Sequence, residues 1–161
     1  MQPSKLDSNF KQSLLTIEDK VAMLEAIGKL KLVQFSTNPE AMATTLATDI
    51  PYEVATALSG VLQAETPPSF EEIETWLTKL PVVHLTLAFA PSRRQLQDYQ
   101  EILQTEGHYE TVLLQVSVNP RLLAGVQVEI QGAYRDFSLQ TAIDSFVHTP
   151  AYQAILSKHL Q

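Results

Sequence analysis

The side chains that most often carry out catalysis or bind metals are sparse in this chain and do not cluster along it. The histidines lack the usual zinc spacing, because none lies three to five residues from another. They are His84, His108, His148 and His159. The chain has no cysteine, which excludes thiolate nucleophiles, disulfides and sulfur-ligated metals. We therefore expect no metal site and no nucleophilic catalysis.

Phosphate-binding and carboxylate chemistry is equally poorly represented. The five glycines stand singly along the chain, so no glycine-rich phosphate loop is present. Glu71, Glu72 and Glu74 could suggest a pair of catalytic carboxylates. They fall in the first turn of a predicted helix, where negative charge stabilises the helix dipole, and this structural role is favoured. The sequence therefore predicts a protein that is not an enzyme and needs no cofactor.

The charge of the chain disfavours nucleic acid as a partner. Eighteen acidic and 11 basic residues give a net charge of −7, whereas phosphate backbones require Lys and Arg. Residues 1–80 carry 6 basic and 11 acidic residues, so the front half is the more acidic one and suits a basic partner surface or simple solubility. No apolar run approaches the length of a membrane span, and the first residues lack a signal-peptide core. We expect a soluble cytosolic protein.

The elements that would position any functional residue are helical in the front half. Thr16 with Asp19, and Ser69 with Glu72, have the spacing of capping boxes and predict two helix starts. Between them, apolar periodicity predicts helices over about 39–47 and 51–63. The second of these carries one broad apolar stripe that includes Val54, Leu58 and Val61. Residues 1–80 are therefore predicted to form a small helix bundle.

The rear half, residues 81–161, alternates between strand and helix patterns. Apolar residues recur with a period of two from Val83 to Phe89, and again over 112–118, where Val112, Leu114, Val116 and Val118 should share one face. The sequence also predicts a helix from Ser92 between these strands and, after them, a strand ending at Ile130, a Gln131–Gly132 turn and a strand over 133–137. A helix from Ser138 follows, with Leu139, Ile143, Phe146 and Val147 inward. The last predicted helix, over 149–161, bears Tyr152, Ile155 and Leu156. The predicted fold class is α+β: an N-terminal helical bundle, then a small α+β domain in the order strand-helix-strand-strand-strand-helix-helix.

One stretch of the rear half has a recognisable pattern. Residues 119–138 read NPRLLAGVQVEIQGAYRDFS, with two large aliphatics before Ala124 and Gly125, then alternating aliphatics. Asp136 and Ser138 follow at the start of a helix. This pattern resembles the C-terminal signature of ATP synthase delta subunits, whose mitochondrial counterpart is the oligomycin-sensitivity-conferring protein. The chain departs from that signature at Gln131–Gly132, where the family has Gly-Asp, and at Phe137, where it has glycine.

The resemblance implies a structural use for the signature residues. These are Leu123, Ala124, Gly125, Gly132, Asp136 and Ser138. The family uses a helical front domain of about a hundred residues, so the shorter front half implies a lost or shortened helix. We expect Gly125 to permit a close backbone approach or a bulge at the start of a strand, and Gly132 to support the hairpin turn. We expect Asp136 and Ser138 to end a strand and to cap the next helix.

The function that the resemblance implies is mechanical. The chain would be a non-catalytic peripheral-stalk subunit of a rotary proton-translocating ATP synthase, on the cytoplasmic face of the membrane. Its bundle would bind N-terminal segments of the alpha subunits, and its rear domain the C-terminal segments of the b subunits. Our candidate contacts are Val54, Leu58 and Val61 in the helical bundle, and Tyr152, Ile155 and Leu156 in the C-terminal helix. The alternative for either stripe is ordinary core packing. Alternatives are an unrelated α+β adaptor and a small enzyme with a polar pocket.

Overall fold

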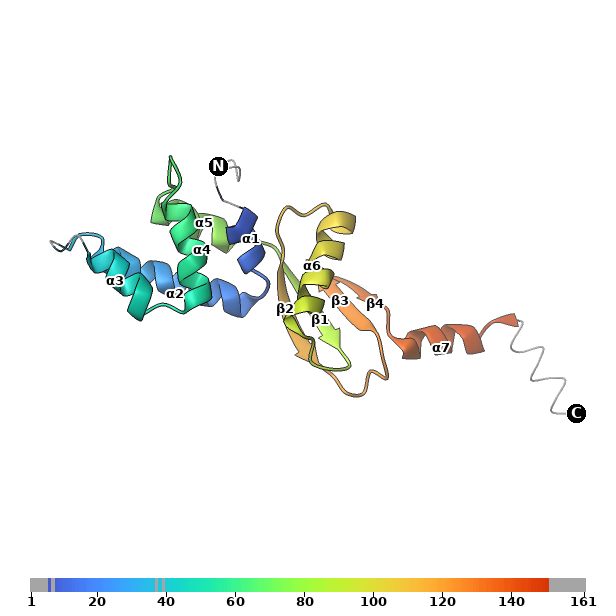
Figure 1. The fold of residues 1–161 in the computed structure, drawn as a ribbon. Helices are drawn as coiled ribbons and strands as arrows, with labels where there is room; N and C mark the ends of the chain where they lie inside the picture. The colour runs from blue at the N-terminus through green and yellow to red at the C-terminus, as the bar shows by residue number, and fades with distance from the viewer. Residues whose placement is uncertain (1–5, 7, 37, 39, 151–161) are drawn as a thin grey trace, which may run out of the picture. The chain divides into compact units, whose positions relative to one another are not determined.

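The computed structural model of the chain describes residues 6, 8–36, 38 and 40–150 (Figure 1). These residues divide into two compact units. The first comprises the chain up to Pro81 together with Tyr99–Leu113, and the second comprises Val82–Asp98 and the chain from Leu114 onward. The helices of the first half of the sequence and the mixed sheet of the second half confirm the predicted α+β class.

The first unit begins with five helices. In chain order they are α1 (Ser8–Ser13), α2 (Ile17–Val33), α3 (Ala41–Thr48), α4 (Tyr52–Leu62) and α5 (Phe70–Lys79). Both predicted capping boxes are present: the hydroxyls of Thr16 and Ser69 accept from the backbone N–H groups of Asp19 and Glu72, and the two carboxylates accept in return. Pro51 stands at the N-cap of α4 and not within its first turn.

Helix α1 is a finding that the sequence pattern did not predict. It spans six residues and buries only Phe10, too little for an apolar period to show. Its single buried ring nevertheless matters, because it lies 6.0 Å from the ring of Trp76 on α5, at an interplanar angle of 46°.

The core of the first unit is built from one face of each longer helix. Helix α2 contributes Met23, Ala26, Ile27 and Leu30, all with exposed fractions of 2% or less. The buried side chain of Gln100, on α6 (Arg93–Gly107), donates Nε2 hydrogen bonds to the carbonyls of Leu14 (2.8 Å) and Val112 (2.7 Å). Because both acceptors are buried carbonyls, this amide fixes the second half of α6 within the first unit.

The second unit contains a four-stranded mixed sheet in the order β2-β1-β3-β4. The strands are β1 (Val82–Leu87), β2 (Leu113–Val118), β3 (Val126–Ile130) and β4 (Ala133–Asp136). β1 pairs antiparallel with β3, and β3 pairs antiparallel with β4. Beside β1, Leu113 N donates to Pro81 O and Asn119 N donates to Leu87 O, which is the constant offset of a parallel pair. Helix α6 supplies the crossover connection that such a pair requires.

The turn between β3 and β4 has two residues, as predicted. Ile130 pairs with Ala133, and the residues between them, Gln131 and Gly132, have φ of 51° and 81°. Positive φ at both central positions is the geometry of a type I′ turn, which matches the twist of the flanking strands. Gln131 adopts it without being glycine or asparagine.

Strand β2 buries Leu113 and Leu114, whereas further along the predicted face Val116 is half-buried and Val118 is 48% exposed. One prediction about a buried face in the rear half is wrong. Helix α7 (Leu139–Val147) should have turned its apolar side chains inward, but none of its residues, all of them described, is buried. An apolar stripe identifies a face that avoids water, and it does not say whether this chain or another one covers that face. The C-terminal helix predicted over 149–161 lies almost wholly outside the described residues.

Candidate partner-binding surfaces

The apolar stripe predicted to bind a partner in front lies mainly in the core of the bundle. Leu58 and Val61 on α4 have exposed fractions of 0% and 1%. Val54, one turn earlier, is half-buried. A partner could contact Leu58 and Val61 only if the helices of the bundle moved apart. Leu58 and Val61 therefore have a packing role in the bundle.

The candidate contacts at the rear, Tyr152, Ile155 and Leu156, lie outside the described residues. The helix just before them presents an apolar surface of its own. On α7, Leu139 is 46%, Ile143 45% and Phe146 60% exposed. These residues are four and three positions apart, so they share one face of the helix. The apolar periodicity of α7, from which a core face was predicted, therefore indicates this exposed apolar surface.

A close backbone approach anchors the start of α7 against the hairpin. Gly125, with φ of 96°, lies directly before β3, and a Cβ built on it would stand 2.4 Å from the carbonyl oxygen of Phe137 and 2.7 Å from Cα of Ser138. Two backbone hydrogen bonds hold the segments together: Phe137 N donates to Val126 O, and Leu139 N to Ala124 O, each at 2.9 Å. Only glycine combines this φ with this contact.

Asp136 organises the turn between β4 and α7. Its Oδ1 accepts from Ser138 N at 2.8 Å, and its Oδ2 accepts from Gln127 Nε2 at 2.9 Å and from the hydroxyl of Tyr134 at 3.3 Å. Hydrogen bonds from the side chain and then the backbone N–H of Ser138 lower the pKa of Asp136 to about 2. Partial desolvation and the nearby Asp136 carboxylate raise the pKa of Tyr134. Asp136 is therefore ionised at neutral pH, and its carboxylate has a structural role in this turn.

Ser138 completes this arrangement as the N-cap of α7. Its hydroxyl accepts from the backbone N–H of Thr141, and its own side chain is buried, with 3% exposed. Leu123, in contrast, is 70% exposed, while its neighbour Leu122 is buried. The signature segment thus fixes where α7 begins and in which direction it leaves the sheet. It builds a platform for a helix, with no arrangement of acid, base and nucleophile.

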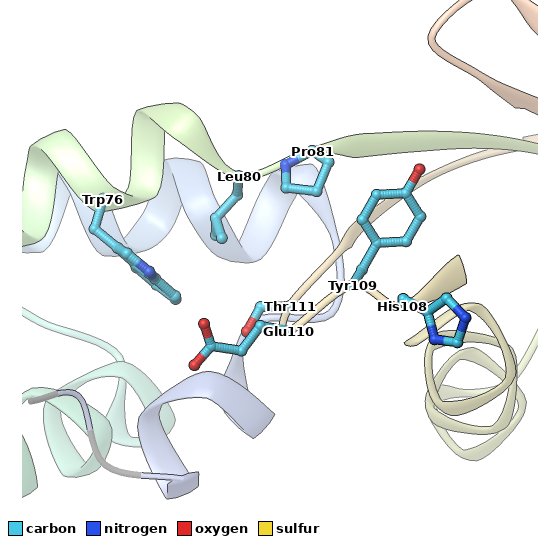
Figure 2. A pocket seen from close by; sticks show the side chains of 7 residues that line it. All are labelled: Trp76, Leu80, Pro81, His108, Tyr109, Glu110 and Thr111. Atoms are coloured by element: carbon cyan, nitrogen blue, oxygen red, sulfur yellow. The ribbon is translucent and has the colours of Figure 1, made fainter. Parts of the chain in front are cut away.

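A pocket of about 240 Å³ lies in the first unit. Its lining residues come from the end of α5 and from the loop between α6 and β2, and they are Trp76, Leu80, Pro81, His108, Tyr109, Glu110 and Thr111 (Figure 2). The sequence pattern did not single out this site. Trp76 is separated from His108, Tyr109 and Glu110 by more than thirty residues in the sequence, and this spacing does not predict a shared cavity.

Within the described residues, no group of three or more His, Asp or Glu side chains is arranged to hold a metal ion. The described helices also include none that is both long and apolar enough to cross a membrane.

Comparison with known proteins decides the family. The sequence model of the ATP synthase delta (OSCP) subunit matches residues 52–149, which is more than half of the chain. The chain belongs to this family. The match extends from α4 through the whole sheet to the end of α7. A search of curated proteins finds no significant match.

Membership in the delta (OSCP) family gives the subunit its general role. It is a non-catalytic subunit of the ATP synthase peripheral stalk, and it works within a membrane-associated complex. Within the signature, Gly125, Asp136 and Ser138 all contribute to the position of α7.

Proposed function

We propose that this subunit links the catalytic head of the synthase to its membrane-anchored b subunits. The acidic helical unit would take N-terminal segments of the alpha subunits. The α+β unit would take C-terminal segments of the b subunits, on the cytoplasmic face of the membrane. Helix-in-groove docking, in which an amphipathic helix lays its apolar face on another apolar face, is the mode that suits both contacts.

The observation that carries the proposal is the apolar face of α7. Leu139, Ile143 and Phe146 are each 45–60% exposed, although large apolar side chains on a short helix normally cover a core. Exposed aromatic and aliphatic residues at helical spacing are the typical anchors of a helix–helix interface. The b subunits are the partner we assign to this face.

The test is capture by the full chain of two separate peptides, one from the N-terminus of the alpha subunit and one from the C-terminus of the b subunit. Ile143→Asp should reduce capture of the b peptide at least tenfold, since it places a charge in the middle of the apolar face. Ser145→Asp is the matched control, because it adds the same charge to another face of the same helix and should leave capture intact.

The proposal fails if the unsubstituted chain captures neither peptide. It also fails at the rear contact if Ile143→Asp and Ser145→Asp behave alike. Because Ile143 is not buried, circular dichroism should show an unchanged fold for both variants, so that a loss of capture reports on the surface itself.

A further inference from the structure

Helix α7 presents an apolar face that the described part of its unit does not cover. Leu139, Ile143 and Phe146 lie along one side of the helix, each 45–60% exposed, and none of the nine residues of α7 is buried. Figure 1 shows α7 extending beyond the sheet. Because apolar area in water is unfavourable, a segment that can reach this face with an apolar side of its own is favoured to cover it.

The residues that follow α7 carry an apolar stripe of the same kind. Residues 151–161, here called the C-terminal segment, lie outside the described residues and read AYQAILSKHLQ. Helical spacing puts four large apolar side chains on one side, with His159 as the one polar residue among them. The four are Tyr152, Ile155, Leu156 and Leu160. The family match ends at residue 149, so the C-terminal segment lies beyond the matched region.

The two stripes mirror each other about Thr149. The apolar positions of α7 lie three, six and ten residues before Thr149, and those of the C-terminal segment lie three, six, seven and eleven residues after it. In two antiparallel helices joined at this point, residues equally far from the connection lie opposite each other. Phe146 is thereby placed opposite Tyr152, and Ile143 opposite Leu156. As helices, the nine residues of α7 and the eleven of the segment would be about 14 Å and 16 Å long.

The connection between α7 and the C-terminal segment is short and suits a reversal of direction. Helix α7 ends at Val147, and the carbonyl of Phe146 accepts from both Thr149 N, at 3.0 Å, and Thr149 Oγ1, at 2.7 Å. Pro150 then lacks the N–H group that would continue the same helix. Residues 148–150 therefore form a three-residue connection, within the ~2–5 residues of common antiparallel helix pairs.

We propose that the C-terminal segment folds back as a helix, antiparallel to α7, and covers its apolar face until a partner displaces it. The tether favours this segment over any free chain, because a short connection gives an effective concentration of about millimolar. The b subunits, which the proposed function assigns to the same face, then bind in competition with the segment. This inference rests on the proposed function only for the identity of the competitor, and the cover itself does not depend on it.

A spin label can be attached at one chosen position, because the chain has no cysteine of its own. Lys158→Cys carries a nitroxide on the side of the segment opposite its stripe, and amide resonances of α7 in the full chain are compared with the label paramagnetic and reduced. Position 158 lies nine residues after Thr149, so folding back brings the label nearest to residue 140. We expect at least a twofold loss of intensity at residues 139–142, larger than the loss at 145–147.

Variants test the two stripes. Leu156→Asp places a charge within the stripe of the C-terminal segment and should abolish the loss of intensity at residues 139–142. Ser157→Asp is the matched control, because it adds the same charge about 100° further around the helix, and it should retain the loss. Ile143→Asp on α7 should also abolish the loss, and Ser145→Asp should retain it. Circular dichroism checks that each variant is folded.

Three results would overturn the inference. The first is a loss of intensity that only decreases with sequence distance from the label, which is the profile of a segment that does not fold back. The second is an equal profile for Leu156→Asp and Ser157→Asp. The third is the same loss at residues 139–142 when only a second, mixed-in chain carries the label, because the face would then bind another copy of the chain.

Capture of the b peptide is measured separately with the same variants. Leu156→Asp should increase this capture at least threefold, since it removes the internal competitor, whereas Ser157→Asp should leave it unchanged. Unchanged capture by Leu156→Asp would refute the displacement by the b subunits. If neither Leu156→Asp nor the unsubstituted chain captures the peptide while the label shows the fold-back, the proposed contact with the b subunits fails and the cover stands.

Discussion

The close approach at Gly125 allows a quantitative prediction for Gly125→Ala. Alanine at a positive φ costs about 1–2 kcal/mol in backbone strain. The new Cβ, 2.4 Å from Phe137 O, also forces β3 away from the start of α7. This movement breaks or stretches the two backbone hydrogen bonds at that junction, with a net contribution of about 1 kcal/mol each. The second unit should therefore lose about 2–4 kcal/mol of stability.

Trp76 lies in the first unit, so its fluorescence does not follow the second unit directly. The assay must therefore report on the second unit by another signal. Amide hydrogen exchange of β3 and β4 in the folded chain does so directly, and urea unfolding followed by circular dichroism gives the size of the change. With a slope of about 2 kcal/mol per molar urea, the midpoint should fall by roughly 1–2 M.

Two other glycines provide matched controls. Gly132→Ala meets no atom within 4 Å, so it carries the strain of its φ of 81° alone and should cost less, about 1–2 kcal/mol. Gly28→Ala sits inside α2 in open space and should stabilise the bundle by about 0.5–1 kcal/mol. If Gly125→Ala costs no more than Gly132→Ala, the contact with Phe137 is not the reason for glycine at this position.

The remaining predictions concern one hydroxyl and one carboxylate. Thr111→Val removes a buried hydroxyl that has no hydrogen-bond partner among the described residues, so the free energy of unfolding should stay unchanged or rise by about 1 kcal/mol. Urea titrations measure this change, and a loss of more than about 1 kcal/mol would reveal a hydrogen bond to Thr111. Asp136 has a folded pKa of about 2, below its unfolded value of about 3.9, so its contribution to stability is complete above pH 4 and is lost as the pH falls toward 2. Urea midpoints between pH 6 and 2.5 should fall less steeply for Asp136→Asn than for the unsubstituted chain, and parallel curves would contradict the assignment.

Much of the local structure could be predicted because the signals are local. A hydroxyl three residues before a carboxylate satisfies the same backbone groups in any helix, so Thr16 and Ser69 marked two helix starts correctly. The Gln131–Gly132 turn followed from the two strand patterns on either side of it. Alternation in β1 placed Val83, Leu85 and Leu87 on the buried face and His84 on the exposed one.

What could not be predicted depends on which surfaces meet. The stripe of α4 and the stripe of α7 look alike in sequence, yet Leu58 is fully buried and Phe146 is 60% exposed. Periodicity gives the direction of an apolar face but not its neighbour. The pocket could not be predicted for the same reason, because only the fold brings Trp76 and Thr111 together. Helix α1 is too short for its single buried residue to form a pattern.

The way the chain divides between its two units determines how the protein can be dissected. The polypeptide passes from one unit to the other after Pro81, after Asp98 and after Leu113. A fragment ending at Pro81 would lack Gln100, leaving the carbonyl of Leu14 without its donor, and would lack one whole side of the Trp76 pocket. No single cleavage separates the two units intact. Proteolysis near residue 81, the boundary predicted from the sequence, should therefore unfold the bundle and would not release it as a folded fragment.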